Sequence, residues 1–189
     1  MITITYLVIL DHLLKNKFIL NNIAKTITII SLILIGFLIL NNYSITLIGF
    51  ESLIINGNYN NFIKLTVTLF SGIVVLLSIN YLQKEKLMHF EYYVLIVLIL
   101  LGLFMVISSY DLISMYLAIE LQSLCFYILA TLKTYTNFSS EAGIKYFILG
   151  AFSSGLLLFG SSILYGFTGL TNFYNLEVLF QNQSIFEEL

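Results

Sequence analysis

The chain has 189 residues, of which 59% are hydrophobic and 10% are charged, and its formal net charge is −2. Soluble domains carry roughly 25% charged residues, so this composition argues against a water-soluble globular fold and favours a membrane protein. Nucleic acid is not expected as a partner, because binding it requires Lys and Arg gathered on one face. The one cysteine, Cys125, can close no internal disulfide and cannot hold an iron–sulfur cluster, which needs several thiolates.

The N-terminal segment, residues 1–22, is predicted to lie at the membrane interface. It carries Asp11, His12, Lys15 and Lys17, which are too many ionisable groups for a membrane span. It also lacks the basic start and the small-residue cleavage site of a signal peptide, so we expect it in the mature protein.

Apolar runs predict an all-α membrane domain over residues 23–169, with about five transmembrane helices at residues 23–40, 65–82, 92–108, 112–132 and 142–167. Their lengths fit the ~17–25 residues that cross the hydrocarbon core. Residues 41–62 are rich in Asn, Gly and Ser and are predicted to form a solvent-facing loop. Residues 170–189 are predicted to form a surface tail in contact with the bilayer.

Loop charges predict the orientation, because lysines are retained on the side from which the helices are inserted. In a five-span topology Lys64 flanks one side, and the other side has Lys15, Lys17, Lys25, Lys84, Lys86 and Lys133. The N terminus is therefore predicted to face the inside. The absence of Pro, Trp and Arg fits an A/T-rich organelle genome, which makes the inside the mitochondrial matrix and the membrane the mitochondrial inner membrane.

Motifs for cofactor chemistry are missing from the sequence. It has no GxG pair, no GK[ST] and no GxSxG elbow, so neither a nucleotide loop nor a serine nucleophile is expected. His12 and His89 fall at predicted membrane surfaces and suggest no metal or haem site. No catalytic residue, cofactor site or metal site is predicted in this chain.

The most informative residue is Glu120, near the middle of the fourth predicted span. An ionised carboxylate at that depth is costly unless it is paired or hydrated, so we expect it to be buried within protein. Tyr116, Ser123 and Tyr127 follow the same helical stripe at spacings of four, three and four. These side chains are candidates for a polar lining.

Lys145 is the second charge within a predicted span. Counted from Ser139 and Thr131 at 1.5 Å per residue, Lys145 lies roughly 9 Å and Glu120 roughly 16 Å from the same membrane surface. The gap of about 7 Å is short enough for a lysine side chain or one water to bridge. The two residues form either a proton relay or a static ion pair that fixes helix packing, and the pattern alone leaves both open.

Local signals also predict how the last two spans begin and pack. Asp111 and Ser139 are candidate helix N-caps, the latter with Glu141 in the first turn. Small residues between Gly150 and Gly166 predict the close approach of another helix.

The stretches YDLISMYLAIELQSLCFYILATLK and FSSEAGIKYFILGAFSSGLLLFGSSILYGFTG resemble the subunit 2 family of mitochondrial NADH:ubiquinone oxidoreductase, respiratory complex I. The likeness is dense over residues 90–169 and includes the step from a membrane Glu to a Lys in the next helix, here Glu120 and Lys145. It implies an antiporter-like fold and a role in proton translocation coupled to quinone reduction, with Glu120 and Lys145 in the proton relay.

The resemblance also implies partners. FMN, iron–sulfur clusters and ubiquinone are expected in other subunits of the complex, and other membrane-arm subunits are expected as neighbours. Family members continue through broken helices with further lysines, so the chain is either one part of a split gene or a truncated product. We expect the split gene, in which a separate polypeptide supplies the remainder of subunit 2. The alternatives are a structural helix bundle without proton transfer and a subunit of a cation/proton antiporter.

Overall fold

The computed structural model describes residues 5, 17–41, 47–50, 52–84, 90–133 and 135–187. Its regular elements are all helical apart from one β-hairpin. In chain order they are α2 (Lys17–Asn41), β1 (Leu47–Gly49), β2 (Ile54–Asn56), α3 (Asn58–Lys84), α4 (Phe90–Ser108), α5 (Leu112–Ala130), α6 (Asn137–Thr168) and α7 (Phe173–Glu187).

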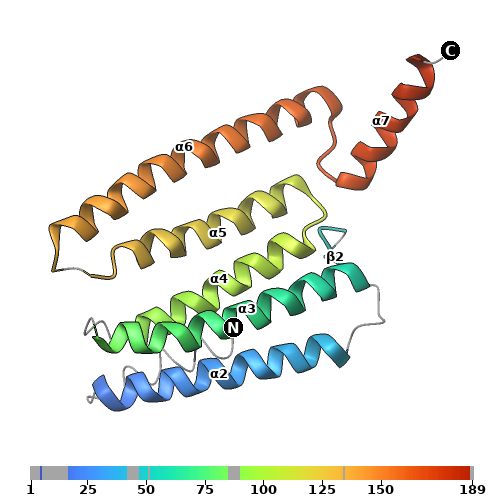
Figure 1. The fold of residues 1–189 in the computed structure, drawn as a ribbon. Coiled ribbons are helices and arrows are strands. Elements are labelled where there is room, and N and C mark those ends of the chain that lie inside the picture. The colour runs from blue at the N-terminus through green and yellow to red at the C-terminus, as the bar shows by residue number, and fades with distance from the viewer. Residues whose placement is uncertain are drawn as a thin grey trace.

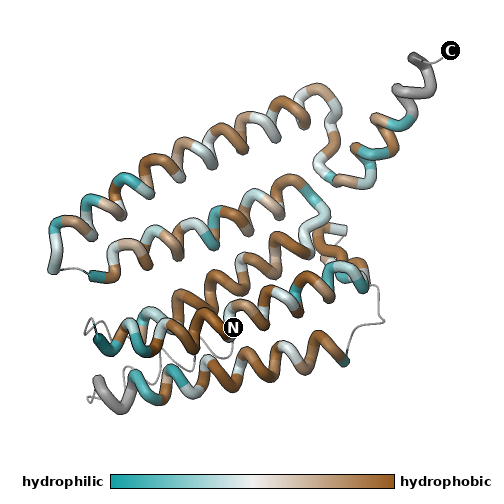
Figure 2. The backbone as a smooth tube through the Cα atoms, viewed as in Figure 1, coloured by the Kyte–Doolittle hydropathy of each residue, from teal (hydrophilic) through white to brown (hydrophobic). Residues whose placement is uncertain are grey.

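Among the described residues, five helices are long and apolar enough to cross a membrane, namely α2 to α6. They lie side by side in alternating directions, with α6 at the outer edge, and α7 turns away from them (Figure 1). Hydrophobic residues dominate their length, and hydrophilic ones gather toward their ends (Figure 2). The predicted all-α membrane bundle of about five helices is confirmed.

The helices extend beyond the predicted spans at several ends. Helix α3 begins at Asn58 and α6 at Asn137, in stretches predicted to be loop. Polar residues outside the hydrocarbon core can remain helical, so hydropathy alone understates helix length. The predicted surface tail contains α7, and the predicted loop at residues 41–62 contains the hairpin as well as the start of α3.

The N-terminal segment and the two histidines, which were predicted to lie at membrane surfaces, fall largely outside the described part of the chain. Most of residues 1–16, including Asp11, His12 and Lys15, lies outside the described residues, as does His89. Lys17 already belongs to α2, so the helix begins before the predicted start of the first span at residue 23.

The core has two parts. Helices α2, α3 and α4 share a cluster of buried residues that contains Ala24, Val75 and Tyr93. Helices α4 and α5 meet around Leu95, Ile99 and Cys125. Burial decreases toward the edge: 33% of the hydrophobic span of α4 is buried within the chain and 0% of that of α6.

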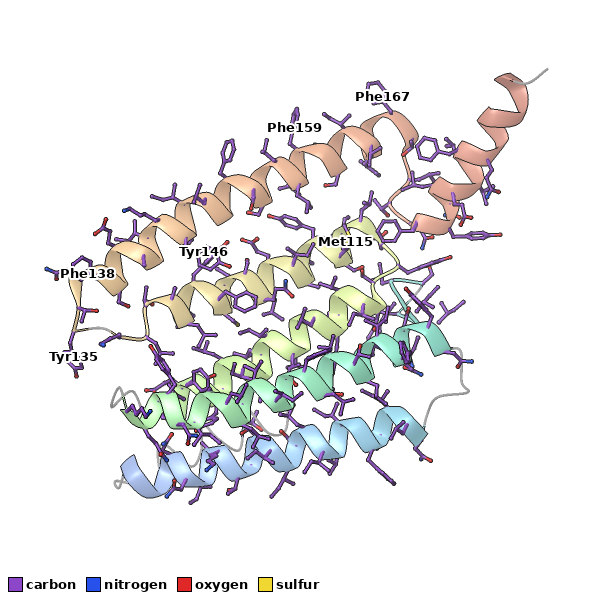
Figure 3. All side chains as sticks on the ribbon, viewed as in Figure 1. Met115, Tyr135, Phe138, Tyr146, Phe159 and Phe167 are labelled. Carbon is purple, nitrogen blue, oxygen red and sulfur yellow. The ribbon has the colours of Figure 1, made fainter. Side chains whose placement is uncertain are left out.

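Helix α6 contacts the bundle along a seam of mostly small residues. Its protected positions recur at spacings of three, four or seven, which places them on one helical face. They are Ser139, Gly143, Gly150, Ser154, Leu157, Ser161 and Thr168. The opposite face carries large exposed side chains such as Phe159 and Phe167, which point away from α5 (Figure 3).

Two glycines fix the register between α5 and α6. A Cβ atom on Gly143 would lie 1.9 Å from Thr131 Cγ2, and one on Gly150 would lie 1.8 Å from the Tyr127 hydroxyl oxygen. The absence of a side chain at these two positions therefore allows the helices to approach closely. Of the small residues predicted to pack, Gly150, Ser154 and Ser161 lie on this seam, whereas a Cβ atom on Gly155, Gly160 or Gly166 would have no neighbour within 4 Å among the described residues. Gly143 is a seam residue outside the predicted stretch.

Backbone hydrogen bonds join three connections at one end of the bundle. The Tyr110 amide donates to the Leu53 carbonyl of the hairpin (2.9 Å), and the Phe173 amide at the start of α7 donates to the Tyr110 carbonyl (3.1 Å). The Leu112 amide donates to the Thr171 carbonyl (3.0 Å). The hairpin, the turn between α4 and α5, and the connection to α7 thus form one linked end.

The two predicted helix caps have different outcomes. Asp111 is the N-cap of α5 and accepts a hydrogen bond from the Ile113 amide (3.1 Å), so that prediction is confirmed. The Ser139 prediction is wrong, because α6 begins at Asn137 with Thr136 as its N-cap residue. The Ser139 hydroxyl instead donates to the Ala130 carbonyl at the end of α5 (2.9 Å).

Candidate functional site

Glu120 lies in the middle of α5, on the face that meets α6. Tyr127 marks this face, because its ring packs edge-on against Tyr146 and Phe147 of α6 with centroid distances of 5.0 and 5.6 Å. Figure 3 shows Tyr146 between the two helices. Glu120 precedes Tyr127 by seven residues, which is close to two full helical turns and places both on the same side of α5.

The register between the helices locates Glu120 against α6. Tyr127 lies opposite Gly150, and the helices are antiparallel, so counting seven residues along each places Glu120 at the level of Leu157. The neighbouring seam serines turn inward on their own helix: Ser154 Oγ donates to the Ala151 carbonyl and Ser161 Oγ to the Leu158 carbonyl. Neither hydroxyl is directed to the carboxylate.

One carboxylate oxygen of Glu120, Oε2, is buried and has no hydrogen-bond partner among the described residues. A buried acceptor left unpaired loses its hydration without compensation, at a cost of about 1–3 kcal/mol and more when charged. Either a proton on Glu120 or a donor from outside the described residues would remove that cost. The arrangement is therefore an acceptor site within the membrane span.

The other predicted lining residues lie on the same stripe of α5 as Glu120 but differ in their contacts. Ser123 is partly buried and donates to the Glu120 carbonyl (2.9 Å), which is a bond within α5. Tyr116 is partly buried one turn before Glu120. Tyr127 is 9% exposed and belongs to the aromatic contact with α6. All three share the predicted stripe with Glu120.

The structure does not bring Lys145 to Glu120. Lys145 Nζ lies 2.5 Å from Glu141 Oε1, one turn earlier in α6, and the two side chains are 71% and 58% exposed. Lys145 follows the seam residue Gly143 by two positions, which rotates it about 200° to the outer face of the helix. Within the described chain, Lys145 is thus a surface cation of α6.

The predicted depth gap was too small for a physical reason. Gly143 contacts Thr131, so Lys145 lies only two residues, about 3 Å, deeper than Thr131. Glu120 lies eleven residues, about 16 Å, deeper. The axial separation is therefore about 13 Å rather than about 7 Å, because Gly143, four residues after Ser139, lies at the level of Thr131.

A second polar site within the spans surrounds Lys64. It was not predicted from the sequence, because Lys64 was counted there only as a loop charge. Lys64 lies in α3 and its ammonium donates to Asn56 Oδ1 of β2 (2.8 Å). Asn61, on the same helix, is 2% exposed. The close spacing of Asn56, Asn61 and Lys64 was a sequence signal, but the hairpin that directs Asn56 to the helix was not foreseen.

Comparison with known proteins gives the family. Residues 109–188 match the family model Proton_antipo_M, described as NADH:quinone oxidoreductase/Mrp antiporter, TM. This range contains α5, α6 and α7, and therefore Glu120 and Lys145.

Relatives extend the similarity toward the N terminus. NADH-ubiquinone oxidoreductase chain 2 of Marchantia polymorpha is 51% identical over 146 residues, which cover 73% of this chain and 30% of the relative. NADH-quinone oxidoreductase subunit N of Jannaschia sp. is 44% identical over 125 residues, which cover 66% of this chain and 26% of the relative. The chain thus spans less than a third of the length of these relatives.

Solved structures agree on the fold. A chain of respiratory complex I from Thermus thermophilus, solved with bound aureothin, superposes with a TM-score of 0.74 at 26% identity. A chain of the membrane-bound sulfane sulfur reductase, an archaeal respiratory membrane complex, gives 0.72 at 22% identity and supports the fold alone. Each match covers 90% of this chain and 36% of the solved chain. The predicted resemblance is confirmed, and the chain belongs to the NADH:quinone oxidoreductase/Mrp antiporter family of membrane proteins, among relatives named chain 2 and subunit N.

Proposed function

We propose that this chain is a membrane-arm subunit of a proton-pumping NADH:ubiquinone oxidoreductase, where it contributes to proton translocation coupled to quinone reduction. The observation that carries the proposal is the 51% identity over 146 residues to NADH-ubiquinone oxidoreductase chain 2. The family match over residues 109–188 includes α5, the helix that carries Glu120.

In this proposal the chain takes part in proton movement and not in electron transfer. FMN, iron–sulfur clusters and ubiquinone belong to other subunits of the complex. The one cysteine supports this division, because Cys125 is buried against Leu95 and Ile99 in the apolar contact between α4 and α5.

Glu120 is the proposed relay group. It combines a mid-span position with a buried oxygen that has no donor among the described residues. A carboxylate at this depth is stable only when a cation or a hydrogen-bond donor faces it. A carboxylate of this kind can couple a movement of charge in an adjacent helix to the uptake or release of a proton.

Lys145 has a different place in the proposal from the one its sequence position suggested. About 13 Å of axial separation and an outward orientation prevent direct proton exchange with Glu120 through this chain. Its exposed ammonium is available to a neighbouring subunit that covers α6. Lys145 would then act in the relay across a subunit boundary.

The proposed partners are helices that cover the outer side of α5 and α6. Support comes from the hydrophobic span of α6, none of which is buried within the chain, and from the unpaired oxygen of Glu120. Other membrane-arm subunits supply part of this cover, and the remainder of the subunit 2 sequence supplies the rest. Membrane lipids complete it.

We place the chain in the mitochondrial inner membrane with its N terminus toward the matrix. The described lysines support this orientation. Lys25, Lys84 and Lys133 lie near helix ends on one side of the bundle, whereas Lys64 lies toward the other. The excess of lysine marks the side from which the helices were inserted.

Affinity purification of the tagged chain from native membranes tests the proposal. We expect it to co-purify with NADH:ubiquinone reductase activity. The family description also includes Mrp antiporters, so the alternative is a cation/proton antiporter. Sodium-linked proton transport in a particle without electron-transfer subunits would favour that alternative.

A further inference from the structure

A groove outside the Glu120 site lies among α2, α3 and α4. Its volume is about 390 Å³, and it combines a polar end with apolar walls. Asn56, Asn61 and Lys64 form the polar end, and the apolar walls are Ile35, Leu38, Ile39, Leu101 and Phe104.

The groove lies at the hairpin end of the bundle. Its α2 and α4 residues come from the last turns of helices that end at Asn41 and Ser108, and Lys64 comes from the early part of a helix that begins at Asn58. The Lys64 ammonium reaches back to Asn56 of the hairpin, at the end of the bundle, whereas Ile35 and Leu101 lie six and seven residues, about 9 and 10 Å, from the ends of α2 and α4. This is the order in which a bilayer presents its headgroups and its acyl chains.

The Lys64 ammonium has N–H donors that no described residue accepts. An ammonium carries three donors, and the structure assigns one of them to Asn56 Oδ1 at 2.8 Å. Within the described residues no carboxylate forms an ion pair with Lys64, and the side chain is partly buried. A partly buried cation with remaining donors and no anionic neighbour among the described residues favours an anionic ligand.

We propose that this groove binds an anionic phospholipid, with its phosphate on the Lys64 ammonium and one acyl chain along the apolar walls. A free phosphate would use the polar end alone and leave the apolar walls uncovered. A zwitterionic lipid would bring a cationic group beside Lys64 and lose much of the attraction. The site is independent of the Glu120 relay.

Photolabelling of the intact complex in vesicles tests the site. The vesicles consist of unlabelled phosphatidylcholine with a trace of a photoreactive lipid. That lipid is either phosphatidylglycerol or phosphatidylcholine, and both carry the same diazirine-bearing acyl chain. Adducts are mapped by mass spectrometry to peptides with Leu38 or Phe104, and are normalised to those on the exposed face of α6 around Phe159. We expect phosphatidylglycerol to label the groove about fivefold more than phosphatidylcholine, the preference that one lysine near a lipid headgroup provides.

Matched variants separate the lysine from the general membrane environment. Lys64→Gln keeps a donor for Asn56 but loses the charge, and should bring the two lipids to equal labelling. Lys84→Gln removes an exposed lysine from the opposite end of α3 and should leave the preference unchanged.

Four results would overturn the proposal. Equal labelling by both lipids in the unmodified complex would show that the headgroup is not recognised. A preference that survives Lys64→Gln would place recognition elsewhere. Groove peptides without any lipid adduct would show that another protein segment covers them. Loss of the preference on adding inorganic phosphate, at the concentration of the labelled lipid, would identify a phosphate site.

Discussion

The contact between Gly143 and Thr131 gives a quantitative prediction about the α5–α6 seam. In Gly143→Ala the new Cβ would lie 1.9 Å from Thr131 Cγ2. Carbon atoms pack favourably at about 3.5–4.0 Å, so α6 or the threonine must move by roughly 2 Å. Rotation of the threonine is opposed by the hydrogen bond from its hydroxyl to the Ile128 carbonyl (3.0 Å).

The expected cost follows from two opposing effects. Overpacking of this kind costs about 1–3 kcal/mol, and the better helix propensity of alanine returns up to about 1 kcal/mol. A net destabilisation of about 1–2 kcal/mol remains. In Gly155→Ala, on the same helix, the new Cβ meets no atom of the described residues within 4 Å, so that variant adds no clash within the chain.

A second variant identifies the clash as the cause. Thr131→Ser removes Cγ2 but keeps the hydroxyl, and the next neighbour, the Cβ atom of residue 131, lies 3.4 Å away. Gly143→Ala combined with Thr131→Ser should therefore regain most of the lost stability. The assay is the midpoint temperature at which this chain dissociates from the purified complex. A Gly143→Ala complex that dissociates at the same temperature as Gly155→Ala would refute the packing described here.

Three further predictions concern the α5 cap, the topology and the independence of the two charges. Asp111→Ala removes the N-cap of α5 and should cost about 1 kcal/mol, seen as faster amide exchange in its first turn, while Asp111→Asn should retain most of the protection. Cysteines at Tyr135 and Tyr174, which are 92% and 56% exposed, should react with an impermeant maleimide from opposite sides of the membrane, and reaction from the same side would contradict the five-span topology. Glu120 and Lys145 are far apart, so the losses in complex stability caused by Glu120→Gln and by Lys145→Met should be additive. The loss in the double variant should equal their sum within about 0.5 kcal/mol. A larger difference would indicate direct contact between the two side chains.

The helices of the fold could be predicted because each apolar run is long enough to span a bilayer. Their ends could not, since residues such as Asn58 and Asn137 are helical without being hydrophobic. The hairpin was also hidden in the polar stretch. Phe50 and Ser52 adopt positive φ angles of 51° and 67° in its turn, and neither residue type is typical of that conformation.

The site was predictable to the extent that it lies within one helix. Spacing along α5 is enough to put Glu120 and Tyr127 on one face, because helical geometry is fixed locally. The relation of Glu120 to Lys145 depends on the register between two helices, which the steric fit of Gly143 against Thr131 determines. Hydropathy contains no information about that fit.

Glu120→Gln tests the central claim most directly, because it keeps the side-chain shape and hydrogen bonding and removes the titratable charge. The measurement is the number of protons pumped per electron transferred by the assembled complex, with Glu120→Asp as the variant that retains the charge. If Glu120 belongs to the proton relay, the ratio falls in the Gln variant, is partly retained in the Asp variant, and the amount of assembled complex is unchanged. An assembled Gln variant that pumps at the ratio of the unmodified complex would show that Glu120 is structural.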